Sequence, residues 1–355
     1  MAENAAAGPV ARYAFLDRVG LEIEGLSRFA IADLNEKFLA FRSDARPSAS
    51  IRVKIGPFVP DLAGATNVDH HYFIRKNYVY FREYLPGIAF EAEIRGLEED
   101  AIEIRFHVLG KSRLLPANLL YPDWALHAHI LQPLLECKLG MQGIFLMHAG
   151  GVAKQGKALL LIGRGGSFKT TYCFRLVGKG FDFIGDDLVM FDEGKVYPFP
   201  IHAAYFDYHL RHGLVSESDL GGLRRARMIP HLCAPPQPSF RLAAPSLPTE
   251  VILIHPRREL GSPDLKPMAL ATAVEKTHRN NGMERMSNVP SNIQIGNFLN
   301  AYGLVFPGHV FARHRETSLA ALTRLLSRSK AWMMETSTHW DERNLALVGS
   351  RADLY

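Results

Sequence analysis

The sequence predicts an α/β fold in two parts. A mainly β (α+β) accessory domain is expected over residues 1–115, and an α/β domain with a phosphate-binding loop over residues 116–355. The chain of 355 residues is long enough for two hydrophobic cores. Before residue 108, short runs alternate apolar and polar residues, as antiparallel strands do. At residues 159–177 an apolar strand leads into a glycine-rich turn and a helix, the order of a phosphate-binding loop.

The composition is that of a folded globular chain. Apolar residues make up 47% and charged residues 22%, close to the averages for such chains, so neither disorder nor a membrane class is indicated. The formal charge of +5 is modest and is not gathered in a stripe of lysine and arginine. We therefore expect no nucleic-acid partner.

The cysteines and the N-terminus favour a cytoplasmic protein. Cys137, Cys173 and Cys233 lie far apart without C-x-x-C spacing, which is typical of a reducing compartment and predicts buried apolar side chains. The first residues lack the pattern of a signal peptide, and no apolar run is long enough to span a membrane. The expectation is therefore a cytoplasmic chain without a membrane partner.

The accessory domain is predicted from four alternating runs and one helical pattern. The runs are residues 50–55, 78–81, 89–94 and 101–108. Residues 31–41 carry apolar residues at helical spacing, and glycine and proline at 110–122 indicate the domain boundary. Because no catalytic cluster is visible, this domain is expected to recruit a substrate or to support oligomers.

The second domain is predicted to alternate strands and helices. Its expected elements are a helix at 124–139 interrupted at Pro133, strands at 144–152 and 159–162, a helix at 169–177, strands at 181–185, 188–191 and 250–255, and helices at 287–301 and 319–333. The residues AKQGKA predict a tight turn before the second of these strands. Prolines after residue 195 indicate long loops, and no internal repeat occurs.

The turn after the 159–162 strand is one residue away from the pattern G-x-x-x-x-G-K-[ST], in which backbone N–H groups surround phosphates. Gly163, Lys169 and Thr170 fall in register. The lysine suits the terminal phosphates and the hydroxyl suits Mg²⁺. The candidate nucleotide-binding residues are Gly163, Arg164, Gly165, Gly166, Ser167, Phe168, Lys169, Thr170 and Thr171.

Phe168 occupies the place of the second glycine, where a side chain normally obstructs the phosphate. Two interpretations are open. The ring can close the site, which leaves a degenerate loop kept for structure. Alternatively, Gly165 and Gly166 supply the turn, and the ring points away from the ligand, into the core or toward a base.

Two further features accompany the loop. Asp186 and Asp187 follow an apolar segment and are expected at a strand end, beside the loop in a parallel sheet. There one carboxylate can face the phosphates while the other orients a metal-bound water or a neighbouring group. Taken alone, the pair favours an ordinary turn. His148 lies in an apolar strand 21 residues before Lys169; a lone histidine in such a place is more often a core residue.

In order and spacing, HAGGV, GRGGSFKT and a GDD whose aspartates lie 17 and 18 residues after Lys169 resemble the catalytic core of the HPr kinase/phosphorylase family. The resemblance covers about residues 143–189. It implies the P-loop fold of HPr kinases and PEP carboxykinases and a kinase that uses ATP and Mg²⁺. It also implies His148 as the active-site histidine, Lys169 and Thr170 as the phosphate and metal contacts, and Asp186 as the base that takes a proton from a serine hydroxyl, with Asp187 beside it. The candidate metal ligands are Thr170 and Asp187.

The downstream acidic signature of that family is not visible, since KVYPFPIHAAYFDY follows, and Glu193 and Asp207 are the nearby carboxylates. The chain looks closer to the shorter HPr-kinase-like proteins of peptide modification or small-molecule pathways. The predicted function is therefore transfer of the γ-phosphoryl group of ATP to a hydroxyl of a peptide, protein or small molecule. The acceptor, the choice among ATP, GTP and pyrophosphate, and a homo-oligomer stay open.

An arginine is expected to neutralise charge on the transferred group. The candidates are Arg164, Arg224, Arg225, Arg227, Arg257 and Arg258, each of which fits a solvated surface charge equally well. Arg257 is preferred, because it follows a buried strand whose carboxyl end is expected to line a ligand crevice, and His255 shares that place.

Two other functions compete with the kinase. One is a catalytically inactive nucleotide-binding or scaffolding protein, in which Phe168 has closed a degenerate loop. The other is a carboxykinase-like transfer to a carboxylic acid, whose additional metal-binding lysine and histidine are not evident in the sequence.

Overall fold

A computed structural model describes residues 10–25, 38–85, 88–111, 125–201, 206–207, 210–211, 239–257, 263–287, 296–338, 340 and 342–352. The chain is mixed α/β and divides into two compact units, Met1–Gln142 with Val289–His314, and Gly143–Asn288 with Arg315–Tyr355. The sequence predicts a division near residue 115, whereas these units place residues 116–142 and 289–314 with the first. No helix in the described ranges is long and apolar enough to cross a membrane.

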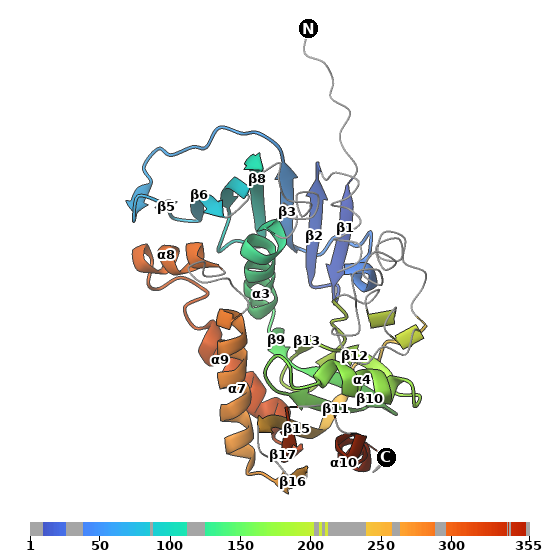
Figure 1. Cartoon of the computed structure of the whole chain (residues 1–355). Coiled ribbons are helices and arrows are strands. Elements are labelled where there is room, and N and C mark those ends of the chain that lie inside the picture. Colours follow the sequence, from blue (N-terminus) through green and yellow to red (C-terminus); the bar gives the residue numbers. More distant parts are fainter. Residues whose placement is uncertain are drawn as a thin grey trace. The chain divides into compact units, whose positions relative to one another are not determined.

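In the described part of the first unit, an eight-stranded sheet has the order β1-β2-β3-β8-β7-β6-β5-β4 (Figure 1). The strands are β1 (Ala11–Phe15), β2 (Val19–Glu24), β3 (Ala49–Ile55), β4 (Thr66–Val68), β5 (Tyr72–Arg75), β6 (Tyr78–Leu85), β7 (Ile88–Arg95) and β8 (Ala101–Lys111). All neighbours are antiparallel except β2 with β3 and β3 with β8. The four predicted strands are confirmed, and the sheet is mainly antiparallel, as expected.

One face of this sheet is apolar and is covered by helices. The helical elements are η1 (Leu39–Phe41), a π-helical turn η3 (His127–Leu131), α3 (Gln132–Met141) and α8 (Asn297–Val305). Phe90 lies against His129, and Phe81 stacks on Phe298 at 5.4 Å between ring centroids. These contacts extend the core of the unit over β6 and β7.

The helix predicted at 124–139 is not interrupted at Pro133. This proline lies in the first turn of α3, directly after the π-helical turn, so the helix continues past it and only its geometry changes there. Of the helix predicted at 31–41, residues 31–37 lie outside the described residues, and 39–41 form a short 3₁₀ turn.

The opposite face of the sheet is polar and carries two buried glutamates of β7, Glu91 and Glu93. Glu93 accepts hydrogen bonds from the Tyr78 hydroxyl at 2.9 Å and from Arg95 at 3.1 Å, and Glu91 pairs with Arg82 at 3.0 Å. Burial acts to raise the pKa of Glu93, but these hydrogen bonds outweigh it and hold the pKa below its ordinary value. On β7, this face therefore carries glutamates that are paired with neighbouring basic and hydroxyl groups.

In the described part of the second unit, a six-stranded sheet has the order β12-β10-β11-β15-β17-β16. The strands are β10 (Gly150–Lys154), β11 (Lys157–Ile162), β12 (Asp182–Gly185), β15 (Leu247–Arg257), β16 (Asp264–Pro267) and β17 (Lys330–Ser337), and a small sheet joins β9 (Phe145–His148), β13 (Leu188–Phe191) and β14 (Val196–Tyr197). Strands β11, β15 and β17 are parallel neighbours.

The sheet is buried on both faces, which explains its continuous apolar strands. The helices of the unit are α4 (Lys169–Val177), α7 (Leu270–Ser287), α9 (His314–Leu326) and α10 (Glu342–Ala352). Leu160 and Ile162 of β11 face the cluster that includes α7, α9 and the small sheet. Leu159 and Leu161 face the cluster that includes α4 and α10. The carboxyl end of β11 therefore lies in the middle of a three-layered unit.

Four expectations for this unit need correction. The strand predicted at 144–152 is two strands, β9 and β10, which break at Ala149 and enter different sheets. The helix predicted at 319–333 ends at Leu326, and residues 330–333 begin β17. Helix α7 is not predicted, because its polar sequence hides its apolar positions. Of the helix predicted at 287–301, residues 288–295 lie outside the described residues, while Ser287 ends α7 and α8 begins at Asn297.

A further correction concerns the place of the acidic pair. Strand β12 is not beside β11, because β10 lies between them and is antiparallel to both. Two strands that are each antiparallel to a third run in the same direction, so the carboxyl ends of β11 and β12 lie at one edge. The glycine-rich turn and the acidic pair, which follow these ends, are therefore separated by a single strand.

Candidate functional site

The turn from Gly163 to Phe168 joins the end of β11 to the start of α4, as predicted. A Cβ atom on Gly163 would lie 2.6 Å from Ser167 Oγ and 3.0 Å from the carbonyl oxygen of Ile254, so this position requires glycine. A Cβ atom on Gly165 or Gly166 would meet nothing within 4 Å. The outward side of the turn is therefore bare backbone, which a ligand can approach closely.

Lys169 begins α4 and turns back into the loop. Its side chain is buried, and Nζ donates hydrogen bonds to the carbonyl oxygens of Gly163 at 2.6 Å and Arg164 at 3.2 Å. The helix N-terminus adds its partial positive charge at the same place. A lysine charge and a helix terminus thus coincide at the turn, as the sequence predicts.

Phe168 adopts a left-handed conformation, with φ 63° and ψ 19°, as the residue before α4. Its ring lies edge-on against Trp340 at 5.7 Å, beside the cluster formed by α4 and α10. Trp340 also contacts Tyr172 of α4 at 5.1 Å. Of the two interpretations of Phe168, this packing favours the one in which the ring turns into the core.

A pair of substitutions at Phe168 separates backbone strain from ring packing. Both Phe168→Gly and Phe168→Ala remove the ring, but only glycine adopts the left-handed conformation without strain. We expect Phe168→Gly to have the higher free energy of unfolding of the two, by about 1 kcal/mol, and to bind ATP at least as tightly as the wild type. Urea unfolding and calorimetric titration measure the two quantities. Loss of ATP binding in a folded Phe168→Gly protein would instead make the ring a part of the site.

The hydroxyl groups of the loop have different environments. Ser167 Oγ is buried and makes no hydrogen bond within the described residues, so it is a polar atom still in need of a partner. Thr170 and Thr171 lie in the first turn of α4, where Thr170 is half-buried and Thr171 is buried. Of the two threonines, Thr170 is the more accessible for a metal ion.

His148 and Asp187 meet across the small sheet. His148 ends β9 opposite Leu188 of β13, and its Nδ1 lies 3.2 Å from Asp187 Oδ1. The Ala149 N–H group donates to the carbonyl oxygen of Asp187 at 3.1 Å. Asn281 of α7 accepts a hydrogen bond from the His148 N–H group at 3.0 Å. The histidine is therefore fixed by two elements and touches one carboxylate of the acidic pair.

Gly150 of the HAGGV motif allows α4 to pack closely against β10 and near the end of β12. A Cβ atom on Gly150 would lie 2.9 Å from Cys173 Sγ and 3.4 Å from Lys169 Cβ. The Cys173 thiol donates to the carbonyl oxygen of Gly185 at 3.6 Å, and Gly185 is the residue before Asp186. Because Gly150 has no side chain, the first turns of α4 can lie close to Gly185, the residue before the acidic pair.

Cys173 is influenced by both predicted catalytic charges. Burial raises the pKa of its thiol most, the Asp186 carboxylate raises it further, and the Lys169 ammonium acts to lower it. Both charges therefore lie within electrostatic reach of one side chain. Asp186 is half-buried and Asp187 is exposed. The structure brings Lys169, Asp186, Asp187 and His148 into one region.

Arg257 ends β15, which is parallel to β11, so it lies at the edge of the sheet that carries the loop. It pairs with Glu335 of β17 at 2.5 Å, and His255 is exposed nearby. Arg164 is exposed in the loop and contacts Met283 of α7 at 3.6 Å. Arg224, Arg225, Arg227 and Arg258 lie outside the described residues.

The two other carboxylates considered from the sequence are engaged elsewhere. Glu193 pairs with Arg324 of α9. Asp207 accepts hydrogen bonds from the N–H group and the hydroxyl of Ser239 at 2.6 and 2.5 Å, and Arg211 lies 2.7 Å from it. Both have structural contacts of their own.

In the described ranges, no three or more His, Cys, Asp and Glu side chains form a group that could hold a metal ion. Mg²⁺ in phosphoryl-transfer sites commonly takes one or two protein oxygens and completes its shell with phosphates and water. Thr170 is half-buried and Asp187 is exposed, so the side-chain oxygens of both are accessible from outside the protein.

Three contributors to the site were missed from the sequence: Asn281, Trp340 and Gly150. Nothing near Asn281 in the chain indicates its contact with His148, because it lies in the middle of a polar helix. Trp340 follows β17 and gives no signal of the ring contact with Phe168. Gly150 was visible within HAGGV, where a glycine in a buried strand predicts close approach of another backbone or side chain.

Comparison with family models and with curated proteins found no match to this chain. The fold and the site by themselves define a mixed α/β protein with a strand–glycine-rich turn–helix segment and an acidic pair at one edge of its second sheet.

Proposed function

We propose that this chain is a kinase that transfers the γ-phosphoryl group of ATP to a hydroxyl of a peptide, protein or small molecule. The observation that carries the proposal is the meeting of the loop, Lys169 and the acidic pair at one sheet edge, with His148 against Asp187. The resemblance to HPr kinases in the order of these motifs supports it.

The charges fit the requirements of phosphoryl transfer, in which positioning and neutralisation do most of the work. Lys169 and the N–H groups of the loop would hold the phosphates. Thr170 and Asp187 would hold Mg²⁺, which neutralises phosphate charge when bound. Within the described residues, Cys137 and Cys173 are buried and form no disulfide, which suits the cytoplasm, where ATP is supplied.

Asp186 is the base of this proposal. It accepts the proton that the acceptor hydroxyl loses as its oxygen forms a bond to the γ-phosphorus. The bond between that phosphorus and the bridging oxygen breaks, and ADP leaves. His148 acts as a positioning residue, because its Nδ1 lies 3.2 Å from the Asp187 carboxylate and can hold its orientation.

A second candidate function is nucleotide binding without transfer. Two observations favour it: the left-handed Phe168, and the Lys169 ammonium, which already bonds to the carbonyl oxygens of Gly163 and Arg164. In this case the loop responds to a nucleotide, and the first unit provides the interaction with a partner.

Ligand-dependent unfolding of the wild-type chain tests both functions. ATP, ADP, GTP and pyrophosphate are added with and without Mg²⁺, and a ligand at a hundredfold excess over its Kd should add about 2.7 kcal/mol to the free energy of unfolding. Transfer from labelled ATP to a panel of peptides and small molecules with hydroxyl groups is measured in parallel. Stabilisation with transfer supports the kinase, and stabilisation alone supports the second candidate. Without stabilisation by any of the four ligands, both fail.

A further inference from the structure

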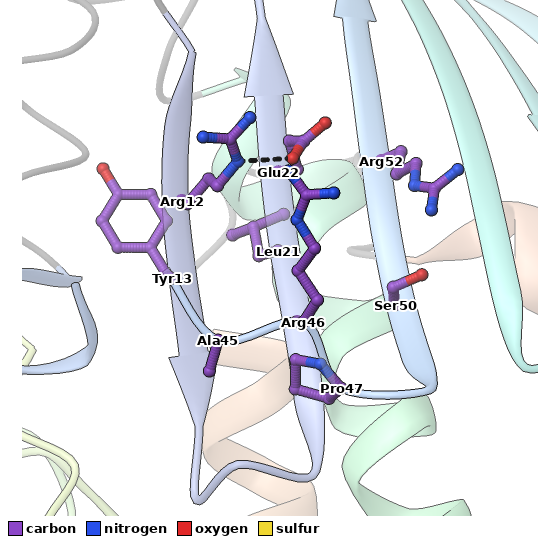
Figure 2. A pocket seen from close by; sticks show the side chains of 10 residues that line it. Arg12, Tyr13, Leu21, Glu22, Ala45, Arg46, Pro47, Ser50 and Arg52 are labelled. Atoms are coloured by element: carbon purple, nitrogen blue, oxygen red, sulfur yellow. Dashed lines mark hydrogen bonds and ion pairs between the residues drawn. The ribbon is translucent and has the colours of Figure 1, made fainter. Parts of the chain in front are cut away.

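The first unit contains a cavity that the proposed kinase site does not use. It lies over β1, β2 and β3, has a volume of about 280 Å³, and is drawn in Figure 2. Its lining residues are Arg12, Tyr13, Gly20, Leu21, Glu22, Ala45, Arg46, Pro47, Ser50 and Arg52. The strands supply one side, and residues 45–47, which lead into β3, supply the other.

A glycine shapes the cavity. Gly20 of β2 pairs with Ser50 of β3, and a Cβ atom on it would lie 3.1 Å from Pro47 Cδ. Because this position has no side chain, residues 45–47 can lie close against β2. Farther along β1, β2 and β3, long side chains of the polar face line the cavity.

The register of the strands places charges side by side. Arg12 lies opposite Glu22, which lies opposite Arg52, so all three side chains stand on one face of the sheet. Arg12 Nε is 2.7 Å from Glu22 Oε2. In Figure 2, the side chain of Arg46 extends along β2 toward this pair. The lining therefore contains more guanidinium groups than carboxylates.

Only one of the three lining arginines is paired in the described part of the chain. Arg12 has Glu22, and the hydrogen bond between them raises the pKa of the guanidinium; Asp44 and Glu24 lie near enough to raise it further. For Arg46 and Arg52, the described residues provide neither a hydrogen bond nor an ion pair. Both side chains are exposed, and the register places Arg52 between Glu22 of β2 and Glu103 of β8 on the same face of the sheet.

We propose that this cavity binds the carboxylate or phosphate group of a small anionic ligand. The guanidinium group presents its N–H donors in a planar fork that matches the oxygens of both groups. Two such forks and the Ser50 hydroxyl line one cavity, which is large enough for a small molecule but has little apolar lining to favour a hydrophobic one. The site belongs to the first unit and is independent of the proposed kinase activity.

Calorimetric titration of the full chain with inorganic phosphate and with succinate tests the proposal and separates the two anion types. Arg46→Gln and Arg52→Gln are each expected to weaken binding about tenfold, since each removes charge-assisted hydrogen bonds. The matched control is Lys54→Gln, which removes one positive charge two residues farther along the same face of β3 but outside the lining. It should change the affinity less than about twofold.

A fourth variant distinguishes a ligand site from loss of structure. Glu22→Gln removes the carboxylate that competes for Arg12 and is expected to strengthen anion binding, which a merely damaged protein does not do. Titrations repeated in Lys169→Met show whether phosphate binds at the loop instead. Thermal unfolding verifies that every variant is folded.

The outcomes divide clearly. The cavity site is supported when the binding of either anion is retained in Lys169→Met and weakened in Arg52→Gln. The anion that binds more tightly identifies the chemical group, phosphate or carboxylate, that the cavity prefers. The proposal is overturned when neither anion binds at concentrations up to about 10 mM, or when Lys54→Gln weakens binding as much as Arg52→Gln.

Discussion

An Asp186→Asn variant is expected to bind ATP as tightly as the wild type and to transfer its phosphoryl group about 10²- to 10⁴-fold more slowly. Asparagine has nearly the same shape as aspartate but cannot accept the proton of the acceptor hydroxyl. Asp186 is half-buried at the end of β12, beside Gly185, so the substitution leaves the packing of the turn in place. The change is therefore expected in the rate and not in the affinity.

Initial rates with labelled ATP, at saturating nucleotide and with the best acceptor found for the wild type, measure this loss. Asp264→Asn is the matched control: it is the same substitution on the edge strand β16, at the opposite end of the sheet order from β12, where Asp264 pairs with Lys266. Equal rates for Asp186→Asn and the control would remove Asp186 from the role of base.

The HAGGV, GRGGSFKT and GDD motifs are held together by side-chain contacts that their spacing in the sequence does not reveal. Gly150 makes room for Lys169 and Cys173, and the Cys173 thiol reaches the carbonyl oxygen of Gly185. A Cβ atom on Gly185 would lie 2.2 Å from the carbonyl oxygen of Leu188, so this glycine sets the sharp turn that carries the acidic pair. Gly150 and Gly185 therefore determine the positions of Lys169 and of the acidic pair.

The loop and its helix could be predicted from the sequence because their signals are local. The strand before the turn is a continuous apolar run, the helix begins at Lys169 and ends at Val177 as expected, and Gly178 follows it. The tight turn between β10 and β11 is equally local: Gln155 and Gly156 both have positive φ, as a two-residue hairpin requires.

The remaining parts depend on contacts between distant segments. The antiparallel β10 enters between β11 and β12, and this order follows from tertiary packing rather than from any strand's own pattern. Asn281 reaches His148 across 133 positions in the chain. Trp340 holds the ring of Phe168 from the segment before α10. A single sequence contains no signal for these pairings.

The arginine-lined cavity was missed for a similar reason. Arg12, Arg46 and Arg52 come from β1, from the segment before β3 and from β3, and each alone is an ordinary surface charge. The unusual parallel pairing of β2 with β3 places Glu22 opposite Arg52. From the sequence alone, antiparallel strands were expected in this region, and nothing indicated that the three arginines lie beside one cavity.

A Lys169→Met variant is expected to lose ATP affinity about 10- to 100-fold, because the ammonium that provides charge-assisted hydrogen bonds at the loop is absent. Methionine retains most of the aliphatic stem, which is buried, so α4 should stay folded. The rate of transfer at saturating ATP is expected to fall as well, by about 10²- to 10³-fold, since the same charge stabilises the transferring group.

Lys179→Met is the matched control, because this exposed lysine follows the end of α4 and is remote from the turn at the start of the helix. Titration with ATP and Mg²⁺ gives the affinities, and labelled transfer gives the rates. A folded Lys169→Met protein that binds ATP within about twofold of the control would show that the loop is not a phosphate site. Loss of affinity and rate in Lys169→Met, together with loss of rate alone in Asp186→Asn, assigns binding to the loop and proton transfer to the acidic pair.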